Sequence, residues 1–113
     1  MSERVIGRLS QIPRGEGRNF EVDGTRIAVF RTWTDELFAT EPDCPHRQGP
    51  LADGLIGNGR VVCPLHDRSY DLQTGEEIGG ECRLRTYGVR AGEDGAILLD
   101  LASLPKQEAV AAA

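Results

Sequence analysis

Residues 43–50 read DCPHRQGP, and residues 61–71 read VVCPLHDRSYD. Each segment carries one cysteine and, two or three positions later, one histidine. A thiolate and an imidazole from each segment form a mixed ligand set that suits a zinc ion or an iron–sulfur centre. The chain has only two histidines, so both belong to this pattern. The four candidate metal ligands are Cys44, His46, Cys63 and His66.

The residues around these candidate ligands favour tight turns. Pro45 and Pro64 each follow a cysteine directly, which stiffens the backbone beside each thiolate. Gly49, Gly54 and Gly59 lie in or between the two segments and permit a sharply bent path. Main-chain N–H groups in such turns can point at sulfur and stabilise its negative charge. The pattern therefore predicts a metal centre held by two loops.

Length and composition indicate one small globular domain. With 113 residues, 39% hydrophobic and 27% charged, the chain suits a single core and is not expected to be disordered throughout. A net charge of −5 without a Lys/Arg run disfavours nucleic acid as a partner. The apolar runs are far shorter than the roughly 20 residues of a membrane-spanning helix, so no membrane partner is expected. Cysteines placed beside histidines suit a reducing compartment, and we expect a cytoplasmic protein.

Short strand-like runs separated by turn residues predict an all-β fold. The 14 glycines and six prolines argue against long helices, and helical periodicity is weak throughout. Asp23-Gly24 is a turn pair that favours a tight hairpin. Residues 106–113 suit a frayed helical turn or a disordered tail. The expected strands cover residues 18–22, 25–33, 37–40, 60–62, 69–72, 84–90 and 96–101.

Further motifs extend the pattern beyond the four candidate ligands. The segments are Cys44-Pro45-His46, Leu51-Ala52-Asp53-Gly54, Cys63-Pro64-Leu65-His66, Tyr70-Asp71 and Thr74-Gly75-Glu76. Together they resemble the Rieske 2Fe-2S signature, and the similarity runs from about residue 38 to residue 101. The resemblance implies a single Rieske domain over residues 1–104 and a tail at 105–113. In that domain an antiparallel base sheet carries a cluster-binding subdomain at about residues 42–72.

The resemblance also implies one 2Fe-2S cluster, with Cys44 and Cys63 on one iron and His46 and His66 on the other. Two ferric ions, two sulfides and two thiolates sum to zero charge when the imidazoles are neutral. A cluster held by four thiolates starts at minus two, so an added electron costs more there. Rieske centres accordingly have potentials of about −150 to +300 mV, against about −400 mV for plant-type clusters.

Departures from the high-potential members of the family place this chain low in that range. Those relatives carry a disulfide between the two loops, and the matching positions here are Gly49 and Leu65. Their serine, whose hydroxyl bonds a sulfide, is matched by Arg68. Their tyrosine is retained as Tyr70, which is expected to donate to a cysteine sulfur. We therefore predict a low-potential, ferredoxin-like centre.

Other residues of the two loops have two interpretations. They are either ordinary solvent-exposed loop residues or a rim around the exposed histidine edges where a redox partner docks. Leu51 is a further candidate for a small apolar contact on this rim. The candidate second-shell and rim residues are Arg47, Gln48, Pro64, Leu65, Arg68 and Tyr70.

The predicted function is outer-sphere electron transfer rather than catalysis. No histidine remains for a second, mononuclear iron, so the chain is not expected to be an enzyme itself. The family resemblance implies a soluble carrier that takes single electrons from an NAD(P)H-linked flavin reductase and passes them to a terminal oxygenase. The alternative is the Rieske-type small subunit of an assimilatory NAD(P)H nitrite reductase. A structural zinc domain is a remote alternative.

Three further residues carry structural expectations. Cys82 is interpreted as a small apolar filler, with a redox-active thiol as the alternative. Trp33, at the end of an expected strand, and Tyr87 are both expected to pack in the core or at its rim.

Overall fold

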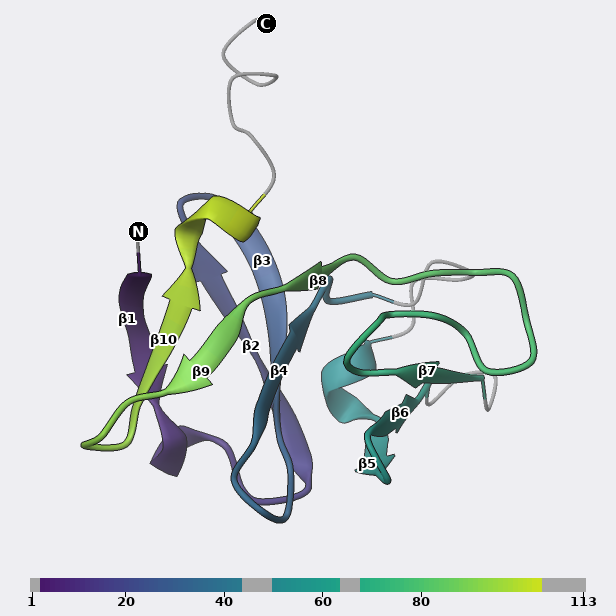
Figure 1. Cartoon of the computed structure of the whole chain (residues 1–113), viewed down its shortest axis with the longest axis horizontal. Helices are drawn as coiled ribbons and strands as arrows, with labels where there is room; N and C mark the ends of the chain where they lie inside the picture. The colour runs from purple at the N-terminus through teal and green to yellow at the C-terminus, as the bar shows by residue number, and fades with distance from the viewer. Residues whose placement is uncertain (1–2, 44–49, 64–67, 105–113) are drawn as a thin grey trace, which may run out of the picture.

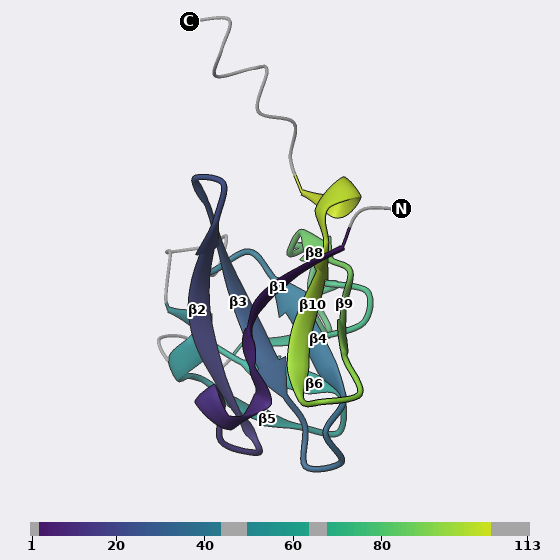
Figure 2. The same cartoon turned by 90° about the vertical axis from the view of Figure 1, so that its left-hand side faces the viewer.

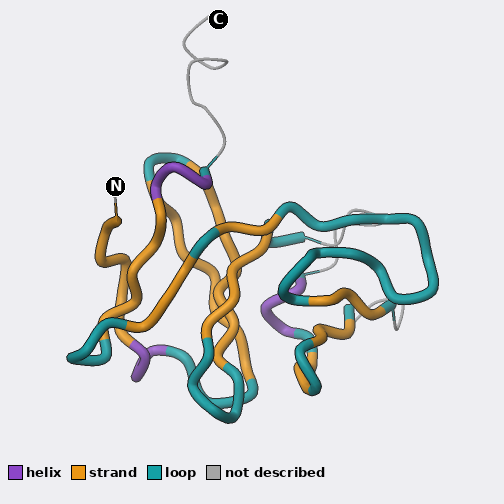
Figure 3. The backbone as a smooth tube through the Cα atoms, in the orientation of Figure 1, coloured by secondary structure: helices purple, strands orange, loops and turns teal. Residues whose placement is uncertain are grey.

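The structure is a computed structural model that describes residues 3–43, 50–63 and 68–104. This part of the chain consists of strands joined by turns and three short 3-10 helices, so the all-β prediction is confirmed (Figure 3). None of the described helices is long and apolar enough to cross a membrane. The helices are η1 (Leu9–Gln11), η2 (Leu51–Asp53) and η3 (Leu101–Ser103).

A four-stranded antiparallel sheet, ordered β2-β3-β4-β8, forms the centre of the molecule (Figure 1). The predicted hairpin joins β2 to β3, and Asp23 and Gly24 both adopt positive φ, at 52° and 80°. This turn conformation matches the right-handed twist of the two strands that it connects. The strands are β2 (Glu16–Val22), β3 (Thr25–Arg31), β4 (Leu37–Thr40) and β8 (Thr86–Tyr87).

A three-stranded antiparallel sheet, ordered β1-β10-β9, lies in front of the first sheet in Figure 2. Strand β1 was not expected from the sequence, because its residues are exposed or half-buried and show no clear apolar alternation. The strand expected over residues 84–90 is divided at Gly88, since β8 pairs with β4 whereas β9 pairs with β10. The strands are β1 (Glu3–Arg8), β9 (Val89–Ala91) and β10 (Ala96–Asp100).

A small antiparallel sheet, ordered β5-β6-β7, lies to one side of the central sheet (Figure 1). Its strands are β5 (Leu55–Gly57), β6 (Arg60–Val62) and β7 (Ser69–Asp71), of which β5 was not expected. Gly54, between η2 and β5, lies against the backbone of β6. A Cβ atom at this position would overlap the carbonyl oxygen of Val62. Only glycine therefore permits this close approach.

Two hydrophobic clusters share strand β3. Ile27 and Val29 face the three-stranded sheet and pack with Ile97 and Leu99 of β10. Ala28 and Phe30 belong to a second cluster, which contains buried residues of the small sheet. All four of these β3 residues have no exposed surface. The second cluster comprises Ala28, Phe30, Leu51, Ala52, Val61, Cys63, Tyr70, Leu72 and Leu84.

The two aromatic residues singled out in the sequence differ in their surroundings. Tyr87 is buried in the first cluster, as predicted. Strand β3 ends at Arg31, two residues before Trp33, and the Trp33 side chain is 70% exposed. Trp33 therefore lies outside the core, and its indole packs at the rim against Gly15, where an added Cβ would overlap the ring. The chain turns at residues 32–36, where Thr32 N–H donates to the carbonyl oxygen of Glu36 at 2.9 Å.

Asp35 stabilises this turn through two arginines. Its backbone has a positive φ of 68°. The carboxylate accepts hydrogen bonds from Arg14 Nε at 2.8 Å and from Arg31 Nε at 2.9 Å. These bonds, from Arg14 first and Arg31 second, lower the pKa of the Asp35 carboxyl from its usual 3.8 to about 2. The turn between β3 and β4 is thereby attached to the segment that precedes β2.

Asp35→Asn keeps a residue type that tolerates positive φ but removes the charge that both arginines contact. We expect a lower Tm at pH 7. Because folding depresses this pKa, the contribution of the carboxylate is fully present above 3.8 and is lost as the pH falls through about 2. The Tm difference between variant and wild type should therefore shrink between about pH 4 and pH 2, as followed by circular dichroism.

Asp23→Asn is the matched control. Asp23 also has positive φ, but it forms a single exposed ion pair with Arg4. Exposed pairs contribute little, so its effect on Tm should be small. An Asp35→Asn effect that stays constant down to pH 2 would contradict the assignment.

Gly54→Ala tests the close approach of η2 to β6. The added methyl group meets a backbone atom that cannot rotate away, so we expect a loss of about 1–3 kcal/mol in the free energy of unfolding. Gly57→Ala is the control, because a Cβ at Gly57 meets nothing within 4 Å. It should stay within about 0.5 kcal/mol of wild type in urea unfolding. Equal losses in both variants would show that the contact is unimportant.

Candidate metal centre

The structure describes one of the four candidate ligands. Cys63 follows β6 and belongs to the second hydrophobic cluster. Of the predicted second-shell and rim residues, Arg68 and Tyr70 are described. The predicted site residues outside the described ranges are Cys44, His46, Arg47, Gln48, Pro64, Leu65 and His66.

Cys63 lies at the start of the second ligand segment and has no exposed surface. Its N–H donates to the carbonyl oxygen of Arg68 at 2.7 Å, so the two ends of this segment are held together. Strand β6 leads into the segment, and β7 leaves it and pairs back with β6. The thiol is thus shielded from water at the base of a closed loop.

The first ligand segment is also closed at its base. Asp43 and Pro50 form an antiparallel bridge on either side of it. Leu51 N–H donates to the carbonyl oxygen of Pro42 at 3.0 Å. The chain then enters η2, where Leu51 is fully buried in the same cluster as Cys63. Leu51 therefore cannot provide the exposed apolar contact that the sequence analysis suggested.

The bases of the two segments lie together. Leu55, just after η2, pairs with Val62, just before Cys63. Gly54 contacts the same Val62 backbone, as described above. The first segment ends at η2 and the second begins after β6, so this pairing holds the described bases of the two segments side by side. A cluster that takes one thiolate and one imidazole from each loop fits this arrangement, because a buried thiol already lies at the junction.

Tyr70 lies on β7, opposite Val61 of β6, and is fully buried. It belongs to the same hydrophobic cluster as Cys63. Burial of a tyrosine usually requires a partner for its hydroxyl group. The predicted hydrogen bond from Tyr70 to a cysteine sulfur is compatible with this placement and stays a prediction.

Arg68 forms an ion pair with Glu77, which no local sequence pattern predicts. Its Nη1 atom donates to Oε2 of Glu77, and the Glu77 side chain is only 5% exposed. The hydrogen bond with Arg68 lowers the pKa of the Glu77 carboxyl, which outweighs the opposite effect of burial. The same bond raises the pKa of Arg68. In the sequence, Glu77 looks like one of two adjacent turn glutamates, and no local signal marks it as buried.

Cys82 is half-buried and packs against the cluster that contains Cys63. Its N–H donates to Oε1 of Glu77 at 3.2 Å. This environment agrees with its interpretation as a small packing residue.

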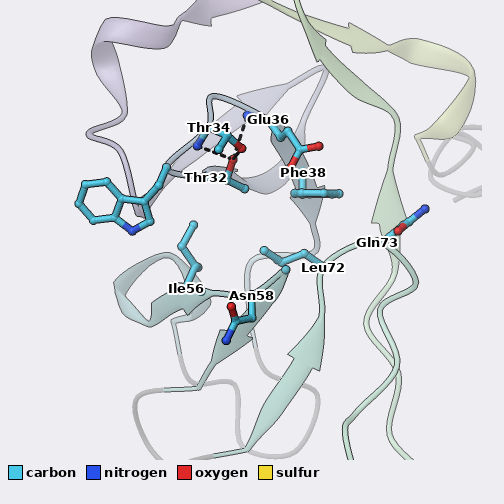
Figure 4. Close-up of a pocket in the computed structure, with 11 residues that line it drawn as sticks. Thr32, Thr34, Glu36, Phe38, Ile56, Asn58, Leu72 and Gln73 are labelled. Atoms are coloured by element: carbon cyan, nitrogen blue, oxygen red, sulfur yellow. Dashed lines mark hydrogen bonds between the residues drawn. The ribbon is translucent and has the colours of Figure 1, made fainter.

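A groove of about 470 Å³ lies between the turn at residues 32–36 and the small sheet (Figure 4). Thr32 and Glu36 lie on one side of it, and Ile56, Asn58 and Leu72 on the other. The β5–β6 turn borders the groove, whereas Cys63 follows the opposite end of β6. Among the described residues, the groove therefore lies at the end of β6 that is farther from Cys63.

Comparisons with known proteins agree with this geometry. Residues 2–89 match the model of the Rieske [2Fe-2S] domain. The chain is 28% identical over 105 residues to the ferredoxin component of a naphthalene 1,2-dioxygenase system from Pseudomonas aeruginosa, covering 89% of this chain and 99% of that protein. It is 38% identical over 79 residues to 4beta-methylsterol monooxygenase from Methylococcus capsulatus. That match covers 60% of this chain but only 21% of the monooxygenase.

Solved structures show the same fold. The ferredoxin of carbazole 1,9a-dioxygenase from Nocardioides aromaticivorans is 26% identical, with a TM-score of 0.76 over 88% of this chain and 97% of that one. A putative NADPH nitrite reductase small subunit is 21% identical, with a TM-score of 0.80 over 88% and 99% of the two chains. The match to the Rieske family model contradicts the alternative of a structural zinc domain. The chain belongs to the Rieske [2Fe-2S] domain family, and its cofactor is a 2Fe-2S cluster.

Proposed function

We propose that this protein carries single electrons from an NAD(P)H-linked flavin reductase to a terminal oxygenase. The observation that supports this function best is the correspondence with a dioxygenase ferredoxin component over 99% of that protein's length. Within these 113 residues both histidines belong to the ligand pattern, so none remains for a mononuclear catalytic iron. We therefore assign the chain a carrier role and no catalytic step of its own.

The bound cluster supplies one-electron redox chemistry. The chain's own residues determine how the cluster would be held. Cys63 offers a thiolate from the buried end of β6, and the bond from its N–H to Arg68 closes the second loop. We assign Cys44 and Cys63 to one iron and His46 and His66 to the other. This pairing follows the family resemblance.

We further infer a docking rim and a location. The rim would comprise Arg47, Gln48, Pro64, Leu65 and Arg68, beside the histidine-ligated iron. Contacts of this kind are small and brief, which suits exchange of redox partners. The cluster-binding subdomain would cover about residues 42–72, and thiolate ligands suit work in the reducing cytoplasm.

A second function is favoured by a specific likeness. The putative nitrite reductase small subunit matches this fold with a TM-score of 0.80 over almost its whole length. At 21% identity this likeness supports the fold and leaves the electron acceptor open. Both functions require the same cluster, and they differ in whether the partner is met transiently or bound stably.

Reconstitution separates these two functions. We expect the purified protein to show the absorption of a 2Fe-2S cluster, to be reduced by NADH or NADPH through a flavin reductase, and to support turnover of a Rieske oxygenase. Stable co-purification with a sirohaem-containing large subunit would favour the nitrite reductase function instead. Cys63→Ser should abolish the cluster absorption, whereas the matched Cys82→Ser should retain it, since Cys82 lies outside the ligand pattern.

The midpoint potential tests the low-potential assignment. We expect a value in the lower part of the range of about −150 to +300 mV, because Arg68 stands where high-potential relatives have a serine. His66→Cys adds a negative charge to the cluster and should lower the potential further where the cluster assembles. A wild-type midpoint well above zero volts, or an unchanged value in His66→Cys, would contradict the charge argument.

A further inference from the structure

A buried carboxylate lies beside the second ligand loop. Glu77 follows β7 by six positions and returns to it, since Tyr70 and Glu77 form an antiparallel bridge. Its side chain is 5% exposed, whereas that of its partner Arg68 is 39% exposed. The loop over residues 72–85, which contains Glu77, runs beside the small sheet in Figure 1. An ionised group with so little exposure requires compensation by hydrogen bonds and an opposite charge.

Glu77 has two compensating interactions, one through each carboxylate oxygen. Oε2 accepts from Arg68, and Oε1 accepts from the backbone N–H of Cys82 at 3.2 Å. The backbone of Gly80 also packs against the carboxylate, and a Cβ there would overlap it. The side chain is thereby fixed from two sides, by Arg68 at the end of the second ligand segment and by residues 80–82 of its own loop.

The pair lies close to the metal centre. The carbonyl oxygen of Arg68 accepts the N–H of the ligand Cys63 at 2.7 Å. Tyr70, two residues after Arg68, packs in the same cluster as Cys63. Cys82, which donates to Glu77, packs against that cluster. The charge on Glu77 would therefore act on the cluster through a poorly solvated part of the protein, where electrostatic interactions are screened less, whereas the charge on Arg68 is partly exposed to solvent.

We propose that Glu77 is a positioning residue of the redox centre: it fixes Arg68 and offsets its charge, which keeps the reduction potential low. An unpaired arginine would stabilise the reduced cluster, because reduction adds one negative charge. The lowered pKa of Glu77 supports an ionised carboxylate in the pair. This inference rests on the proposed function, since only a redox carrier has a potential to adjust.

Two single variants give shifts of opposite sign. Glu77→Gln replaces the carboxylate with an uncharged amide of the same shape and leaves the charge of Arg68 uncompensated, so the midpoint potential should rise. Arg68→Met removes the guanidinium and leaves the carboxylate, so the potential measured at pH 8 should fall. The double variant R68M/E77Q carries no charge at either position and should return toward the wild-type value. A purely structural role would instead shift both single variants in the same direction.

The pair of Glu3 and Arg90 is the matched control. It joins β1 to β9 through hydrogen bonds of 2.7 and 2.8 Å, on the opposite side of the molecule from the small sheet (Figure 1). Glu3→Gln and Arg90→Met should leave the potential unchanged, which excludes an effect of net charge alone.

The outcomes separate this inference from the proposed function. A wild-type protein without 2Fe-2S absorption would contradict the proposed function. A wild-type protein with the cluster, whose two single variants shift together or not at all, overturns only the role of Glu77. Where a single variant fails to assemble the cluster, assembly in R68M/E77Q supports charge compensation, because replacing both partners leaves no buried charge unpaired. Failure of the double variant as well would overturn it.

Discussion

Strand β3 is buried on both faces, and the rest of the structure depends on this constraint. Side chains alternate along a strand, so Ile27 and Val29 pack against β10 while Ala28 and Phe30 pack against the small sheet and η2. A shift of one residue in register would exchange the two sets and leave both clusters mismatched. The alternation therefore determines where the small sheet lies, and with it the ligand loops.

The metal centre is continuous with this packing. Cys63 is both a candidate ligand and a fully buried member of the cluster that Phe30 shares. The bases of the two ligand segments are closed by backbone hydrogen bonds, and Gly54 permits the contact that holds these bases together. Cluster binding and folding are therefore expected to stabilise each other in this protein.

The ion pairs of the molecule differ mainly in their burial. The pair of Glu3 and Arg90 lies at the surface, where solvent screens its charges. The carboxylate of Glu77 is almost completely buried beside a redox centre, where a charge acts more strongly. A carboxylate–guanidinium pair therefore has little effect beyond the surface at Glu3 and Arg90, whereas at Glu77 and Arg68 it acts on the reduction potential of the cluster.

Local patterns in the sequence predicted the all-β class, the Asp23-Gly24 hairpin and the Rieske family. Turn residues and cysteine–histidine ligand pairs can be recognised within a few consecutive positions. Only the tertiary structure decided the burial of Leu51, the exposure of Trp33 and the division of the late strand at Gly88. It also decided the pairing of Arg68 with Glu77. Each of these depends on which distant segment packs beside the residue, and short-range periodicity does not contain that information.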